Sequence, residues 1–168
     1  MEKICGFYAS NVHLITMILP YLKKQLKKDV KIETFFEQNL SNNINAFLNN
    51  LIIDENEKKI LLNINWKSNK IKKYNIIEKN LKEIIKKNNC IICLISGNKK
   101  YIKYINEMLN KFFKNYQNIN IKIINLYMVT QFDDDIKKIL DEHEFVFNTS
   151  GIHKIEEIFV DYKKEIAN

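Results

Sequence analysis

The feature that most constrains the fold is a repeated switch between two hydrophobic spacings along the chain. Short apolar runs typical of strands cover residues 3–8, 30–36, 59–66, 90–95, 119–129 and 145–147. Between them, apolar residues recur at helical spacing over 12–28, 41–51, 74–87, from 96–98 to 113, over 133–144 and over 152–166. Alternating strands and helices predict a mainly parallel sheet with helices on both faces.

Right-handed crossovers restrict such a sheet to few topologies. We therefore expect a three-layer Rossmann-like or flavodoxin-like α/β fold with five to six strands, and the spacing leaves the strand order open. The chain has 168 residues with three glycines and one proline, so no segment has the composition of a linker. This predicts a single α/β domain over 1–168. Pro20 lies inside the first helical stretch and predicts a kink or a break there.

Composition also bears on location and redox environment. The amino terminus lacks a basic segment followed by an apolar run, and apolar stretches stop well short of the ~20 residues that span a bilayer. Three cysteines do not make a disulfide framework. The sequence therefore predicts a cytoplasmic protein without a membrane span.

The charge is strongly one-sided, with a formal net charge of +7 and 27 basic residues that are all lysines. Lysine attracts polyanions as a point charge, whereas arginine is the preferred bidentate reader of phosphates and base edges. Non-specific nucleic-acid binding is therefore open, while sequence-specific reading of a duplex is disfavoured. The simplest interpretation of the lysine runs is solvated helix faces.

Ligands of open parallel sheets bind beyond the carboxyl ends of the strands. The segment from Ser96 to Lys100 follows the most continuously apolar strand and combines a hydroxyl, Gly97, Asn98 and the lysines Lys99 and Lys100 at a helix start. Backbone N–H groups at such a start bind phosphate or another anion. The alternative is a capped turn with two solvated lysines. Neither a P-loop nor a Gly-x-Gly-x-x-Gly fingerprint is present, so no cofactor is predicted.

The strand 91–95 followed by Ser96-Gly97-Asn98-Lys99 resembles the fourth-strand motif of the CARF family. That motif has Ser or Thr, two glycines, a small polar residue and a basic residue, and this chain has one of the glycines. The resemblance implies a Rossmann-like sensor of cyclic oligoadenylates that dimerises around a symmetric pocket. It also implies that Ser96, Gly97, Asn98 and Lys99 contact the ligand, opposite Ser10 and Asn11. Some family members cleave the ring they bind.

A second candidate site follows the last strand and comprises Asn148, Thr149, Ser150 and Gly151. These side chains are suited to cradling an anion or to bonding a ribose. The same residues also predict the start of the helix over 152–166, because Thr149 or Ser150 would cap it and Glu156 and Glu157 would complement its dipole.

Catalytic candidates are few. His13 follows the first strand and forms a possible nucleophilic pair with Ser10, and His153 follows the last strand. His143 lies among acidic residues and is predicted to be a solvated residue at a helix end.

The remaining distinctive residues are predicted to be structural. Cys90 and Cys93 have the spacing of a metal pair, but residues three apart in a strand point to opposite faces, so we expect core residues and no metal site. The acidic run 133–135 follows a strand end, where Mg²⁺ binding is possible but complementarity to a helix dipole is the simpler reading. Trp66 either stacks on a ligand or closes the core.

These observations favour a small ligand-binding sensor or regulatory domain for a nucleotide-type or other phosphate-bearing ligand, with a cyclic oligonucleotide as one possibility. The first alternative is a phosphodiesterase or ring-cleaving nuclease that uses the same pocket. The second is a lysine-rich adaptor for protein or nucleic acid. The sequence leaves open whether the chain is an enzyme.

Overall fold

The computed structural model describes residues 1–26, 30–50, 53–69, 74–116, 118–132 and 135–160. Its strands are β1 (Glu2–Tyr8), β2 (Lys31–Phe36), β3 (Cys90–Ser96), β4 (Asn120–Met128), β5 (Phe145–Asn148) and β6 (Gly151–Lys154). Its helices are α1 (Asn11–Leu26), α2 (Ser41–Asn49), α3 (Glu55–Leu62), α4 (Tyr74–Ile85), α5 (Lys99–Phe113), α6 (Val129–Phe132), α7 (Ile136–Asp141) and α8 (Ile155–Ile158).

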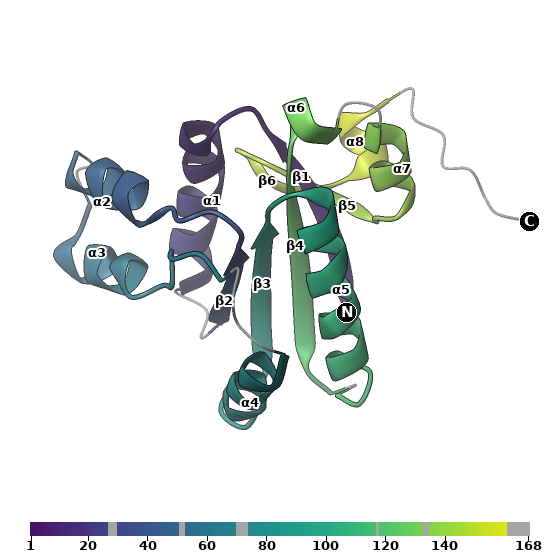
Figure 1. Cartoon of the computed structure of the whole chain (residues 1–168). Coiled ribbons are helices and arrows are strands. Elements are labelled where there is room, and N and C mark those ends of the chain that lie inside the picture. The colour runs from purple at the N-terminus through teal and green to yellow at the C-terminus, as the bar shows by residue number, and fades with distance from the viewer. Residues whose placement is uncertain (27–29, 51–52, 70–73, 117, 133–134, 161–168) are drawn as a thin grey trace, which may run out of the picture.

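The strands form one six-stranded sheet in the order β2-β3-β4-β1-β5-β6 (Figure 1). The first five strands are parallel to their neighbours, and β6 is antiparallel to β5. The α/β fold class is confirmed, and the sheet is mainly parallel as predicted. Since β1, β2, β3 and β4 run the same way, their carboxyl ends meet at one edge.

Each face of the sheet has its own hydrophobic core. The helices α1, α2 and α3 bury apolar side chains on one face, whereas α4, α5, α7 and α8 cover the other (Figure 1). Successive residues of a strand serve opposite cores: Ile4 packs into the first and Cys5 into the second. This two-sided burial explains why β3 is continuously apolar, because no side of it meets water. None of the described helices is long and apolar enough to cross a bilayer.

Two small residues lie in the central strands. Gly6 permits close packing, since a Cβ there would lie 3.1 Å from a side-chain carbon of Leu126 and from the backbone oxygen of Phe147. Cys93 is fully buried, which confirms that it is a core residue, whereas Cys90 at the start of β3 is only partly buried, so the prediction of a core position is wrong for Cys90.

The predicted strand over 59–66 is wrong, because its first half, 59–62, belongs to α3 and its second half forms no strand. Asp54 starts this helix by accepting hydrogen bonds from the backbone N–H groups of Asn56 and Glu57. The apolar run that suggested a strand buries Leu61 from one helix face. Trp66 follows the helix and closes the core: its ring stacks on Phe36 at 5.9 Å and its N–H donates to the Leu61 oxygen.

The predicted helix over 152–166 is wrong at its start: residues 152–154 belong to β6, and the described part is helical only over 155–158. The chain makes a tight hairpin after β5 and returns as β6, so Thr149 and Ser150 are turn residues and cap no helix. Gly151 has a φ of 130°, which glycine adopts without strain. The helix α8 begins at Ile155 and ends at Ile158, and 161–168 lie outside the described residues. Near the other terminus, α1 continues past Pro20 without a break.

Candidate functional site

A cavity of 210 Å³ opens at the carboxyl ends of β1, β2 and β3, beside α6. Its polar lining consists of Tyr8, Asn11, Glu37, Gln38, Ser96, Asn98 and Gln131. We call it the strand-end pocket. The chain leaves β1 for α1 on one face of the sheet and leaves the adjacent β4 for α6 and α7 on the other. This divergence is the topological switch point at which open α/β sheets bind ligands.

The floor of the strand-end pocket is a buried pair of hydroxyl groups. Tyr8 and Ser96, which end β1 and β3, share a hydrogen bond of 2.9 Å between their side-chain oxygens. Burial raises the pKa of Tyr8; the bond to Ser96 lowers it and the charge of Glu37 raises it. The pair therefore presents neutral hydroxyl groups that both donate and accept.

Asn11 adds an acceptor at the start of α1. Its Oδ1 atom is buried and receives no hydrogen bond from the residues that the structure describes. Buried polar atoms are normally paired. The side chain also lines the pocket, so a donor group of a ligand would satisfy it.

The carboxylate of Glu37 occupies the start of α5. It accepts hydrogen bonds from the Asn98 backbone N–H at 2.6 Å and from the Asn98 side-chain amide at 2.7 Å. Asn98 in turn caps α5 by accepting from the backbone N–H of Tyr101. A Cβ on Gly97 would lie 2.7 Å from the Glu37 Cβ, so the glycine permits this approach. The turn that the sequence predicts as an anion cradle thus holds the chain's own anion.

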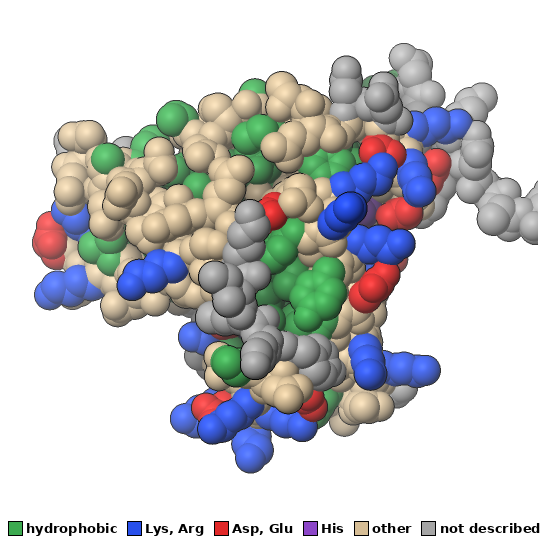
Figure 2. Space-filling view, viewed as in Figure 1, with side chains coloured by type: hydrophobic (Ala, Val, Ile, Leu, Met, Phe, Trp, Pro, Cys, Tyr) green, Lys and Arg blue, Asp and Glu red, His purple; other side chains and the backbone are tan. Residues whose placement is uncertain are grey.

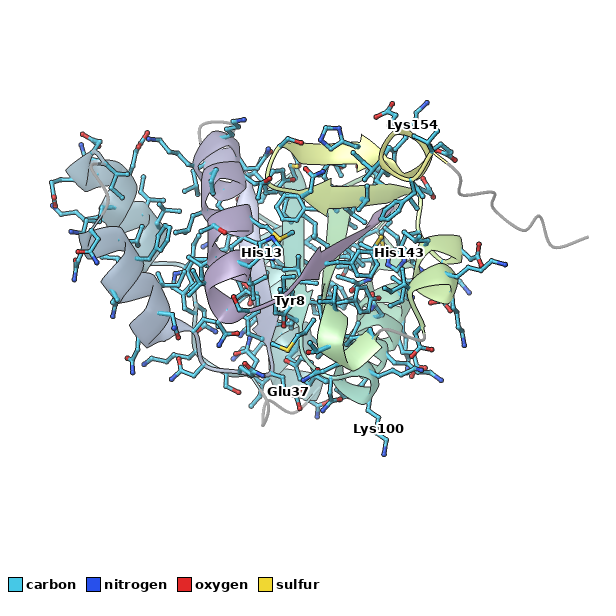
Figure 3. The ribbon with its side chains drawn as sticks, turned by 90° about the horizontal axis from the view of Figure 1, so that it is seen from above. Tyr8, His13, Glu37, Lys100, His143 and Lys154 are labelled. Atoms are coloured by element: carbon cyan, nitrogen blue, oxygen red, sulfur yellow. The ribbon has the colours of Figure 1, made fainter. Side chains whose placement is uncertain are left out.

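The two lysines of this turn do not line the strand-end pocket. Lys99 forms an ion pair with Asp135 and lines a different cavity. Lys100 is exposed and points outward from the start of α5 (Figure 3). Figure 3 looks onto the strand ends, with Tyr8 near the centre and Glu37 to one side.

Of the candidate residues that follow the first strand, one lines the strand-end pocket and two do not. Asn11 lines the pocket, whereas Ser10 accepts a hydrogen bond from the His13 backbone N–H at 3.2 Å and so helps to start α1. The His13 Nδ1 atom accepts from the Ala9 backbone N–H at 3.1 Å. Neither Ser10 nor His13 lines the strand-end pocket, and their side chains bond to backbone groups: the Ser10 hydroxyl to the His13 N–H and the His13 ring to the Ala9 N–H.

The candidates Asn148, Thr149, Ser150 and Gly151 form the β5–β6 hairpin turn, away from the strand-end pocket. The Asn148 side chain accepts from the Ser150 backbone N–H. The Ser150 oxygen lies 2.7 Å from His153 Nε2, and His153 Nδ1 lies 4.0 Å from a Glu157 oxygen. This order resembles a nucleophilic triad, but Ser150 is exposed rather than set in a cavity that excludes water.

The prediction that His143 is solvated is wrong, since its exposed fraction is 3%. Its Nδ1 atom donates to the Ile139 backbone oxygen at 2.6 Å, because a carbonyl oxygen only accepts. Its Nε2 atom therefore accepts from the Asn125 side-chain amide at 3.0 Å. Within the acidic run, Asp135 forms the ion pair with Lys99, while 133–134 lie outside the described residues.

Sequence reasoning missed Tyr8, Glu37 and Gln38 as pocket residues and His143 as a buried one. One signal was present: Asn125 interrupts the apolar run of β4 over 123–128, and an amide in such a run needs a polar partner. Glu37 gave no comparable signal, because its partner Asn98 lies 61 positions away.

Comparisons with known proteins identify no relative: no protein-family model, no curated protein and no solved structure matches the chain.

Proposed function

We propose that the chain is a small ligand-binding domain of sensor or regulatory type, which holds the nucleoside part of a nucleotide-type ligand in the strand-end pocket. The observation that carries the proposal is the convergence of the Tyr8–Ser96 hydroxyl pair and the Asn11 oxygen at the switch point of the sheet. These groups supply both donors and acceptors, as the hydroxyl and amide groups of a nucleoside require.

The charge of the pocket decides which part of the ligand enters. Glu37 is the charged side chain among the described lining residues, and it already binds the amide groups of Asn98. A phosphate at this point would compete with that carboxylate. The uncharged sugar and base therefore enter the pocket, where ribose hydroxyl groups bind the Tyr8–Ser96 hydroxyl pair and the Asn11 oxygen, and phosphates extend outward.

The size of the pocket bears on assembly. Its 210 Å³ lies below the ~300–1,000 Å³ typical of sites that enclose a whole small molecule. A cyclic oligonucleotide would extend beyond one chain. A homodimer that joins two strand-end pockets would enclose it, and this is also what the CARF resemblance implies. Sedimentation with and without ligand tests the dimer.

Isothermal titration calorimetry with ribonucleosides, nucleoside monophosphates, dinucleotides and cyclic oligonucleotides tests the binding function. Substitution of Tyr8 by Phe removes a hydroxyl from the floor, and we expect binding to weaken about 2- to 10-fold, as loss of one hydrogen bond does. Tyr104, which is 49% exposed on α5, provides the matched control Tyr104→Phe. The proposal fails if no compound binds at sub-millimolar concentration, or if both variants bind alike.

A further inference from the structure

A second and larger cavity lies away from the strand-end pocket. It has a volume of 440 Å³ and runs between α5 and α7 over β4, on the face of the sheet opposite α1 (Figure 1). Its apolar wall is formed by Ile102, Tyr127, Phe132 and Ile139. We call it the α5–α7 groove. Its volume lies within the range of sites that enclose a whole small ligand.

The floor of the groove is polar, although it lies over the middle of a parallel sheet. Asn125 of β4 is 2% exposed and accepts a hydrogen bond from the Asn106 side-chain amide at 2.9 Å. It donates in turn to His143, which donates to the Ile139 oxygen. Both N–H donors of the Asn106 amide thus bind partners within the protein, since Asn106 also donates to the Ile102 oxygen.

Two hydrogen-bond acceptors of the groove are unpaired within the described residues. The Oδ1 atoms of Asn106 and Asn110 are buried and receive no hydrogen bond from the described residues. The two side chains lie one turn apart on α5 and both line the groove. Two buried acceptors on one wall favour a ligand with N–H donors, because buried acceptors are costly unless paired.

The charged residues that line the groove are four lysines and three carboxylates, which leaves a small positive excess: Lys3, Lys99, Lys103, Lys138, Glu107, Asp135 and Glu142. Figure 2 shows lysine and carboxylate side chains gathered where α5 and α7 face each other. Lys99 and Lys103 are paired with Asp135 and Glu107. Lys3 and Lys138 also line the groove and form no ion pair with another described residue. An anionic group of a ligand would bind these two without breaking a described pair.

We propose that the α5–α7 groove is a binding site for a planar heterocycle that carries a phosphate, of the size and chemistry of a nucleoside monophosphate. The ring packs on the wall formed by Tyr127 and Phe132, its N–H groups donate to Asn106 and Asn110, and its phosphate binds Lys138 and Lys3. This site differs in charge preference from the strand-end pocket, which favours an uncharged moiety, and it does not depend on that pocket.

The test is calorimetric titration of the whole chain with the four ribonucleoside monophosphates, adenosine and inorganic phosphate, at low and high salt. We expect a monophosphate to bind, and to bind about tenfold more weakly to Asn106→Leu and to Lys138→Ala. Lys79→Ala, on the exposed side of α4, is the charge-matched control and should bind as the unchanged protein does. Inorganic phosphate that binds as tightly as the nucleotides overturns the proposal, as does the absence of nucleotide binding at millimolar concentration.

The variant Ser96→Ala separates the two sites. Weakening by Asn106→Leu but not by Ser96→Ala assigns the nucleotide to the α5–α7 groove, whereas the reverse pattern assigns it to the strand-end pocket and overturns the groove site. If circular dichroism shows that Asn106→Leu is unfolded, Asn110→Leu replaces it. In folded protein, nucleotide should also shift the ring ¹⁵N signals of His143, and unshifted signals contradict the proposal.

Discussion

Replacement of Glu37 by Gln tests the main electrostatic contact of the candidate site. The carboxylate accepts two hydrogen bonds from Asn98 at the start of the 15-residue helix α5. A hydrogen bond to a charged group contributes about 1.5–3 kcal/mol, and a negative charge at a helix start adds about 0.3–1 kcal/mol. Because Glu37 is partly exposed and the glutamine keeps one acceptor oxygen, we expect a loss of about 1–2 kcal/mol of unfolding free energy.

That loss corresponds to a fall in melting temperature of roughly 2–8 °C for a chain of this size. Thermal unfolding followed by circular dichroism at neutral pH measures it. Glu107→Gln is the matched control, since Glu107 lies on α5 with a 65% exposed side chain and a Lys103 contact of 4.0 Å. The control should stay within about 0.5 kcal/mol of the unchanged protein. Equal melting temperatures for Glu37→Gln and Glu107→Gln would refute a bound carboxylate at the α5 terminus.

The same variant has a consequence for ligands. If Glu37 is what keeps phosphate from the start of α5, removing its charge should tighten the binding of inorganic phosphate by Glu37→Gln relative to Glu83→Gln, a control on the exposed side of α4 that lines neither cavity. Titration at low salt measures this. Unchanged phosphate affinity would mean that the helix start is closed to anions for another reason.

Three further substitutions test local features. Tyr101→Phe should cost no stability at pH 7, because the hydroxyl is buried without a described partner. Burial, aided by the charge of Glu37, raises the pKa of Tyr101 from 10 to about 12, so the unfolded chain loses the phenol proton at a lower pH than the folded protein does. Urea unfolding should therefore show that the unchanged protein loses more stability than the variant between pH 10 and 12. His143→Ala should lower the unfolding free energy by about 2–4 kcal/mol, since it leaves the Asn125 amide without its acceptor, and a loss below 1 kcal/mol would contradict the buried network. Gly97→Ala should cost about 1–3 kcal/mol by forcing Glu37 away, and a melting temperature equal to that of the unchanged protein would show that the contact is loose.

The amino-acid sequence by itself determined the fold class, because burial imposes a spacing that local reading detects. The continuously apolar β3 is buried on both faces, and the stripe of α5 from Ile102 to Phe113 covers one of them. Cys93 was also read correctly, since a residue inside a continuously apolar strand is buried whatever the strand order. The apolar pattern gave a wrong prediction for residues 59–62. Their three consecutive apolar residues suggested a strand, whereas the cap formed by Asp54 starts a helix, α3, that includes them.

The partners of the polar residues were decided by the tertiary structure. Glu37 and Asn98 lie 61 positions apart and meet because β2 and β3 are adjacent, so their turns share one edge of the sheet. Asn125 and His143 meet likewise across the face of β4. A periodic pattern records whether a side chain is buried, and it contains no information on which distant side chain completes its hydrogen bonds. For that reason the sequence predicted which edge of the sheet carries the strand-end pocket. Only the folded chain showed that the Glu37 carboxylate already binds the N–H groups at the start of α5, where the sequence predicted a bound anion.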